Sequence, residues 1–220
     1  MIKKVLKMIK KRKFLILLSL LLAVLMTGFS VGPIMSRVEV PEFIINLTHD
    51  NIEIREYKPM LIAEIEVKGS REVAISEGFK VLADFIFGNN IKKNKIKMTA
   101  PVIQQSSQKI KMTAPVIQQS SDKGWIVSFV MPKSYNIDTL PRPVNKDINI
   151  KEIPEKKMAV ITFNGRSEKK NILKHESKLL EFLDKNSFRY NKNTIYAFYN
   201  PPWTLPVLRK NEVMFEIIKE

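Results

Sequence analysis

Residues 51–67 read NIEIREYKPMLIAEIEV, and this stretch decides the fold class. Apolar and polar side chains alternate over residues 51–57 and again over residues 60–67, which is the period of a half-buried β-strand. The pair Lys58-Pro59 interrupts the alternation. We therefore expect two strands joined as a hairpin.

Two stretches change to the period of an α-helix. Ser70 is a suitable N-cap for a helix over residues 71–87, and Gly88-Asn89-Asn90 ends it. Its apolar face carries Ile75, Phe79, Leu82 and Ile86, spaced 4, 3 and 4 residues apart. Gly165 and Ser167 precede a second predicted helix over residues 168–185.

The remaining periodic segments predict further strands, so strands precede and follow each helix. They cover residues 95–103, 109–118, 125–131, 148–153, 157–164, 196–199 and 212–218, with a proline-bearing loop at 132–143. The order favours an α+β fold with a largely antiparallel sheet, one domain over residues 45–220, after a linker at 37–44. The two halves resemble each other, each reading strand, strand, helix, strands.

An internal repeat lies between the first helix and the following strands. Residues 95–107 read KIKMTAPVIQQSS, and residues 109–121 repeat all thirteen letters. We expect each copy to form a half-buried strand with Met98 and Met112 pointing inward, the two copies forming a hairpin around residues 104–108. Each copy's proline belongs at a strand end, an edge or a bulge. One interpretation is a duplication that lengthens a hairpin; the other is that Met98 or Met112 lines a ligand pocket.

The first 36 residues form an export segment rather than part of the fold. No charged residue occurs over residues 14–36, and residues 14–26 read FLILLSLLLAVLM. A helix over residues 14–35 would be about 33 Å long, enough to span a hydrocarbon core of about 30 Å. The short apolar centre, with Gly28 and Ser30 behind it, also suits a cleaved signal peptide. Basic residues before the run place the N-terminus in the cytoplasm and the domain outside it.

Charge and cysteine content exclude several classes of protein. The net charge is +15, but seven of the 37 basic residues lie in the first thirteen positions, and no acidic residue precedes Glu39. In the rest of the chain, basic and acidic residues alternate along strands, as at Glu53, Arg55 and Glu56 or at Glu212 and Glu216. We interpret that pattern as a solvated face, which argues against nucleic-acid binding. The absence of cysteine excludes disulfides, thiolate metal ligands and thiol catalysis.

Four stretches in order resemble the SOUL family of haem-binding proteins. They are EIREY at 53–57, GFKVLADFIFGNN at 78–90, KIKMTAPV at 95–102 followed by VSFVMP at 127–132, and YNPPWTLPVLRKNEVMFEI at 199–217. The resemblance implies a barrel-like α+β fold of two similar halves and non-covalent affinity for haem or a related tetrapyrrole. The implied architecture is also similar to that of effector-binding domains, which capture amphipathic small molecules.

The resemblance leaves the ligand site to be assigned residue by residue. Some family members carry histidine in the EIR-x-Y strand, where this chain has Glu56, a poor ligand for haem iron. We expect haem to lie in an apolar cleft along the first helix, at Phe79, Leu82 and Ile86, although a core role explains these residues equally well. His175 is a further candidate, with a satisfied structural histidine as the alternative. We expect no metal site formed by side chains alone, because the two histidines lie far apart in the sequence.

Together these observations predict a membrane-tethered, exported haem- or tetrapyrrole-binding protein without catalytic activity. The domain would face the periplasm or cell exterior, and would be secreted or periplasmic if the signal is cleaved. The alternative is a module of the same fold that binds other amphipathic ligands or acts as a scaffold. No phosphate-binding loop, HExxH or GxSxG motif occurs in the sequence. The Lys-, Ile- and Asn-rich composition suggests a bacterium with an AT-rich genome.

Overall fold

The computed structural model describes residues 38–92, 107–201 and 203–218, with Arg12, Leu15, Ile16 and Ser19. Residues 38–220 form one compact unit and residues 1–37 another. No helix within the described residues has the length and apolarity needed to cross a membrane. The predicted anchor at residues 14–35 falls outside those residues, apart from three isolated positions, as does the first copy of the repeat apart from Ser107.

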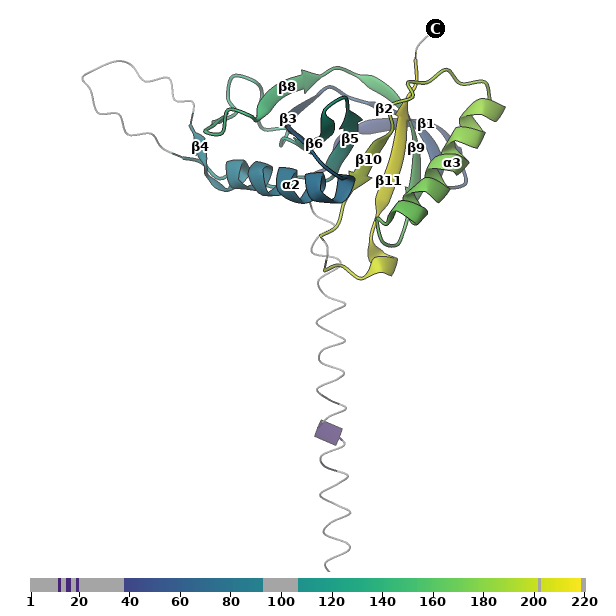
Figure 1. Ribbon diagram of the computed structural model, residues 1–220, viewed down its shortest axis with the longest axis horizontal. Coiled ribbons are helices and arrows are strands. Elements are labelled where there is room, and N and C mark those ends of the chain that lie inside the picture. Colours follow the sequence, from purple (N-terminus) through teal and green to yellow (C-terminus); the bar gives the residue numbers. More distant parts are fainter. Residues whose placement is uncertain are drawn as a thin grey trace, which may run out of the picture. The chain divides into compact units, whose positions relative to one another are not determined.

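The described part of the domain contains short and long strands, two α-helices and one 3₁₀ helix (Figure 1). In chain order they are β1 (Phe43–His49), β2 (Ile52–Tyr57), β3 (Met60–Val67), α2 (Arg71–Phe87), β4 (Asn90–Ile91), β5 (Val116–Ser121), β6 (Gly124–Val130), β7 (Arg142–Pro143), β8 (Asn149–Ile153), β9 (Lys156–Phe163), α3 (Lys169–Lys185), β10 (Ile195–Phe198), η1 (Pro206–Leu208) and β11 (Asn211–Glu216). The predicted α+β class is confirmed.

Nine strands form one antiparallel sheet in the order β1-β2-β9-β11-β10-β5-β6-β3-β8. Outward from the central β10–β5 pair, β11, β9 and β2 follow on one side, and β6, β3 and β8 on the other. In chain order, β2-β3-α2-β5-β6 therefore corresponds to β8-β9-α3-β10-β11. The sheet is curled but open, with β1 and β8 at its edges, rather than a closed barrel (Figure 1).

The predicted hairpin between residues 51–57 and 60–67 is wrong. Both strands form, but β2 pairs with β1 and β9, whereas β3 pairs with β6 and β8. In the sheet, β2 therefore lies in the half with β9, β11 and β10, and β8 lies in the half with β3, β6 and β5. Lys58-Pro59 is the link through which the chain crosses from one half to the other. Pro154-Glu155, between β8 and β9, is the corresponding link in the other direction.

Helix α2 covers the half of the sheet that contains β3 and β6 (Figure 1). The Ser70 hydroxyl accepts a hydrogen bond from the Val73 amide, and Gly88, with a φ of 131°, provides the left-handed residue that ends the helix. Gly78 allows a close approach, because a Cβ there would lie 2.7 Å from Val127 Cβ. The helix thereby packs directly onto β6.

Helix α3 covers β9 and β11 on the same side of the sheet (Figure 1). The buried stripe of α3 consists of Ile172, Leu179 and Leu183. It packs against one apolar cluster of the sheet, which includes Ile54, Ile161 and Phe215. Its N-cap, Glu168, makes no side-chain capping hydrogen bond, and the first turn contains no acidic residue. Packing, rather than capping, therefore holds this helix.

The second copy of the repeat is a strand only in its last six residues. β5 begins at Val116, directly after Pro115, so the prediction that this proline stands at a strand end is confirmed. Residues 109–115 are not a strand, because their backbone groups bond to separate partners: the Ile110 amide to the Ile86 carbonyl and the Ala114 amide to the Glu39 carbonyl, each over 2.8–2.9 Å. Ile110 enters the core, while Met112 is 38% exposed instead of pointing inward.

Candidate functional site

The face of the sheet opposite the helices contains a cleft, which we call the open-face cleft. Ile62, Ile117, Ile126, Ile153 and Ile195 are among its lining residues and make it mainly apolar. They lie on alternate positions of their strands, so their neighbours in sequence face the helices. The period-2 pattern of the sequence therefore creates two apolar faces, of which only one is covered by helices.

Three methionines add thioether groups to this cleft. Met158 and Met214 are almost fully buried and belong to a small apolar cluster with Tyr57, against which Met60 packs. The Tyr57 hydroxyl lies 3.9 Å from the Met214 sulfur. Methionine side chains adapt to irregular ligands and have a polarisable sulfur. The cleft thus combines a rigid isoleucine surface with a methionine-rich end whose side chains can adapt to a ligand.

Two lysines give the open-face cleft its cationic groups. Lys151 lies 2.7 Å from Glu64, and Lys156 lies 2.8 Å from Glu216. Lys151, Glu64 and Lys156 line the cleft, and the lysines are partly exposed. Their ammonium groups are therefore available to an anionic ligand that competes with the two carboxylates.

A buried ion pair lies on the same face, in the half of the sheet under α3. Arg55 is 3% exposed and Glu212 is not exposed, and their side chains meet at 3.0 Å. Arg55 also contacts Glu53 at 2.6 Å, and Lys210 lies 3.0 Å from Glu212. Burial alone would raise the pKa of Glu212, but Arg55, Lys210 and the hydrogen bond from Tyr199 outweigh it and hold the pKa below its ordinary value. Glu212 is therefore a charged, fully paired group.

Two tyrosines connect the ion pair to the cleft. Tyr199 donates a hydrogen bond of 2.6 Å to Glu212, and Arg55 donates one of 3.0 Å to the Tyr57 hydroxyl. Burial, together with the charge of Glu212, raises the pKa of Tyr57 to about 12 and raises that of Tyr199 as well. Both phenols therefore stay protonated at neutral pH.

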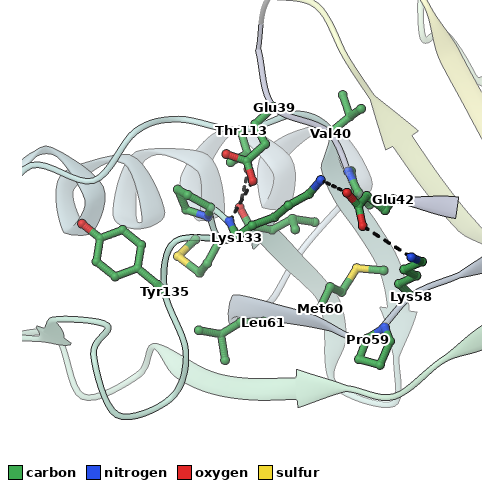
Figure 2. Close-up of a pocket in the computed structure, with 14 residues that line it drawn as sticks. Glu39, Val40, Glu42, Lys58, Pro59, Met60, Leu61, Thr113, Lys133 and Tyr135 are labelled. Atoms are coloured by element: carbon green, nitrogen blue, oxygen red, sulfur yellow. Dashed lines mark hydrogen bonds and ion pairs between the residues drawn. The ribbon is translucent and has the colours of Figure 1, made fainter.

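A second pocket, shown in Figure 2, borders the cleft and is more polar. Glu42 pairs with Lys133 and, at 3.9 Å, with Lys58, while the Lys133 amide donates to Glu39 over 2.7 Å (Figure 2). These bonds fasten the segment before β1 to two loops. Because Met60 lines both pockets, the fastening also fixes one wall of the open-face cleft.

The geometry agrees with the family to which the sequence belongs. Residues 38–216 match the family model described as SOUL heme-binding protein. The chain belongs to the SOUL family. It is 31% identical to Heme-binding protein 2 of Homo sapiens over 163 residues, covering 73% of this chain and 75% of that protein. The Mus musculus protein of the same name is 30% identical over the same shares.

Among solved structures, the crystal structure of the EcmrR C-terminal domain is similar in fold. It superposes with a TM-score of 0.51 at 12% sequence identity, covering 77% of this chain and 98% of that chain. An identity this low shows a common fold and nothing about the ligand. The SOUL domain described above therefore has relatives of the same architecture among proteins of distant sequence.

The structure separates the predicted helix residues from the open-face cleft. Leu82 and Ile86 are buried to 0% and 1% exposure in the core between α2 and the sheet, as the alternative interpretation had it. Phe79 is 37% exposed and packs edge-on against Phe129. Haem contact at Phe79 stays a prediction, and only this one of the three side chains reaches the surface.

The other predicted residues also lie away from the cleft or outside the described residues. His175, on α3, stacks on Phe163 at 4.1 Å, and its Nδ1 lies 2.8 Å from the Asn171 carbonyl. Glu56 alternates with Arg55 and Tyr57 and so projects on the helix-covered side. Met98 lies outside the described residues, and Met112 does not line the cleft. Within the described residues, no group of three or more His, Asp or Glu side chains could hold a metal ion.

Sequence reasoning missed the buried ion pair and the residues of the open-face cleft. The interpretation of Arg55 and Glu212 as parts of a solvated face is wrong, since both are buried. One signal was available: Arg55 and Tyr57 share a strand face with each other and not with Ile52 and Ile54. A strand that carries arginine and tyrosine on its second face is a candidate for a buried polar network.

Proposed function

We propose that this SOUL domain binds haem or a related tetrapyrrole non-covalently in the open-face cleft. The observation that carries the proposal is the apolar isoleucine and methionine surface with two lysines at its border. A tetrapyrrole has a flat apolar macrocycle and acidic side groups, which match these two features. Membership of a haem-binding family supports the same ligand class.

The side chains of the cleft fit such a ligand. The groups that could reach its iron would bind it only weakly. Bound haem would supply an iron centre, for which thioether and phenolate groups are known protein ligands. The raised pKa values of Tyr57 and Tyr199 disfavour phenolate. The thioethers of Met60, Met158 and Met214 are therefore the better candidates, while Lys151 and Lys156 would orient the acidic groups.

The small volume of the cleft limits how much of a ligand it can enclose. Its volume is about 190 Å³, below the roughly 300 Å³ at which closed ligand pockets begin. A macrocycle would therefore lie with one face on the isoleucines and the other toward solvent. Binding of this kind suits capture and release, so we propose a carrier or buffer without catalytic activity.

A second candidate is a module for other amphipathic molecules. The observation that favours it is that neither of the chain's two histidines, His49 and His175, is among the described residues that line the open-face cleft. A ligand without iron, apolar on one side and anionic on the other, would find the same surface and the same lysines. Competition with haemin separates this candidate from the first.

Haemin titration of the full chain in detergent micelles tests the proposal, with micelles alone as the reference. We expect a shifted Soret band for the unaltered protein and at least about tenfold weaker binding for Ile126→Gln/Ile153→Gln, because polar side chains there disrupt the apolar floor. Phe79→Ala is the matched variant on α2 and should bind normally. A spectrum identical to micelles alone contradicts haem binding, and loss of binding only in Phe79→Ala moves the site to α2.

We also propose that residues 1–36 export the domain and tether it to the membrane. The uncharged run at residues 14–36 behind seven basic residues supports this. Fusing alkaline phosphatase, which is active outside the cytoplasm, to the C-terminus tests the orientation. Extraction with alkaline carbonate distinguishes a retained anchor, which stays with the membrane, from a cleaved signal. An inactive fusion contradicts export.

A further inference from the structure

The loop between β10 and β11 carries a group of exposed apolar side chains, which we call the apolar tip. Trp203, Leu205, Val207 and Leu208 are 75%, 61%, 72% and 53% exposed. Four large apolar groups within six residues form a continuous stretch of chain, unlike the single exposed apolar residues that are normal on protein surfaces. The helix η1 forms the end of this loop (Figure 1).

Several backbone groups of the apolar tip form hydrogen bonds within the loop. The amides of Thr204, Leu208 and Arg209 donate to the carbonyls of Pro201, Leu205 and Pro206 over 2.9–3.1 Å. Pro206 has no amide hydrogen, and its carbonyl also accepts from Gly165. Unpaired backbone groups are what usually keep a loop out of an apolar medium. These bonds reduce the number of backbone groups that would lose water if the loop entered the boundary of a bilayer.

Cationic residues lie at the same end of the domain as the apolar tip. The Gly165 amide bonds to Pro206, which brings the segment from Arg166 to the start of α3 beside the loop (Figure 1). That segment carries exposed Lys169 and Lys170 in the first turn of α3. Lysine is unfavourable at the N-terminus of a helix, where acidic residues are the stabilising choice. Residues 199–211, which contain the apolar tip, include no acidic residue, and the exposed Glu168 before Lys169 is offset by Arg166, 3.5 Å away.

We propose that the apolar tip inserts into the headgroup region of an anionic lipid bilayer. Trp203 and the three aliphatic side chains would enter the boundary with the acyl chains, the position that tryptophan favours in membranes. Lys169 and Lys170 would face the lipid phosphates. The charge of this end of the domain matches an anionic surface, and the sign of the charge decides between a bilayer and a neutral apolar partner. The proposal does not depend on haem binding.

The fluorescence of Trp203 in the full chain tests the proposal. Trp125→Phe makes Trp203 the sole tryptophan, since the sequence has two. With phosphatidylcholine–phosphatidylglycerol vesicles, we expect a blue-shifted emission that brominated lipids quench at least about twofold, and a smaller effect with phosphatidylcholine alone. The signal reports the tip alone, so attachment through residues 1–36 does not produce it.

Three variants in that background sharpen the result. Leu205→Ser/Val207→Ser should abolish the quenching, and Lys169→Glu/Lys170→Glu should weaken it on anionic vesicles. Ile44→Ser/Leu47→Ser removes exposed apolar side chains of β1 instead and should leave the quenching unchanged. Vesicle-bound protein with unquenched Trp203 overturns the proposal. So does a blue shift that appears without lipid and grows with protein concentration, which would make the tip a contact between two copies.

Discussion

The two halves of the sheet share one topology but use the open face in opposite ways. When β3 and β9 are aligned at their first residues, the registers make Lys151 the counterpart of Arg55 and Ile126 the counterpart of Glu212. Arg55 and Glu212 are buried and bonded to each other, whereas Lys151 is 42% exposed and bonds to Glu64 instead. The ion pair fills the open face beside β1 in one half, which we call the closed half. The cleft lies over the strands of the other half and also includes Tyr57, Met158 and Met214 of the closed half in its lining.

The first strand explains this difference. β1 extends only the half that contains β2, and the ring of its Phe43 lies 4.4 Å from the Arg55 guanidinium and 5.1 Å from the Tyr57 ring. The other half ends at β8 and has no such cover. The open face is therefore covered next to β1 and uncovered next to β8.

The largest expected effect comes from replacing Glu212 with isoleucine, the residue at its counterpart, position 126, in the other half. Glu212→Ile should lower the free energy of unfolding by about 3–5 kcal/mol, because Arg55 keeps its charge in a buried place and loses this partner. Urea denaturation measures the change. Arg55→Met/Glu212→Ile should regain much of the loss, since it removes both charges. A loss below about 1 kcal/mol for the single variant would show that Glu53 alone satisfies Arg55.

Acid should act on the closed half through the same carboxylate. Glu212 has a pKa below its ordinary value of 4.5, so its contribution to stability is complete above about pH 4.5 and is lost as the pH falls through the lower, folded-state pKa. Glu212→Gln should therefore show a flatter loss of stability below that pH. Urea midpoints measured from about pH 6 to about pH 3 provide the comparison. Equal slopes in both proteins would contradict a shifted carboxylate.

On the helix-covered face, the halves differ in how closely each helix approaches the sheet. Gly78→Ala in α2 should destabilise the domain by about 1–3 kcal/mol, because the new Cβ would lie 2.7 Å from Val127, and this exceeds the gain of about 1 kcal/mol in helix propensity. Thermal and urea unfolding measure the loss. Ser177→Ala, at an exposed position of α3, is the matched control and should be neutral within about 0.5 kcal/mol. Neutral Gly78→Ala would mean that α2 moves outward freely.

The smallest effect is expected at the open counterpart of Arg55. Lys151→Met removes a partly exposed ion pair and should change stability by about 0–1 kcal/mol. The same variant should weaken haemin binding if Lys151 orients an acidic group. Stability and haemin titration together show whether the position serves folding or the ligand. A stability loss as large as that of Glu212→Ile would remove the contrast between the halves.

The sequence predicts the helices and strands of this fold better than it predicts which strands pair with each other. The alternation in residues 51–67 correctly predicts two strands, because a period of two reports which side chains share a face. It carries no information on pairing, so the exchange of β2 and β8 between the halves was missed. The strand β1 was missed as well, since most of its side chains are exposed and its apolar residues do not alternate. Helix α2 was predicted with its bounds because Ser70 and Gly88 mark both ends.

The candidate site was harder to predict because it depends on which apolar face remains uncovered. Leu82 and Ile126 look alike in sequence as apolar members of a periodic segment, yet one is core and the other lines the cleft. Only the arrangement of helices and of β1 separates them. Glu212 shows the same limit for charges, because a carboxylate in a strand gives no sign of the arginine that arrives from β2.

The tandem repeat has a consequence for how the gene can change. Three hydrogen bonds that hold the described copy have their donors within the thirteen repeated residues. The donors are the Ile110 backbone amide, the Thr113 hydroxyl and the Gln118 side-chain amide, which bond to the carbonyls of Ile86, Val130 and Arg71. An in-frame deletion of fourteen codons, one copy with its spacer, would leave these thirteen residues complete. A protein shortened in this way would therefore keep the sequence that forms β5.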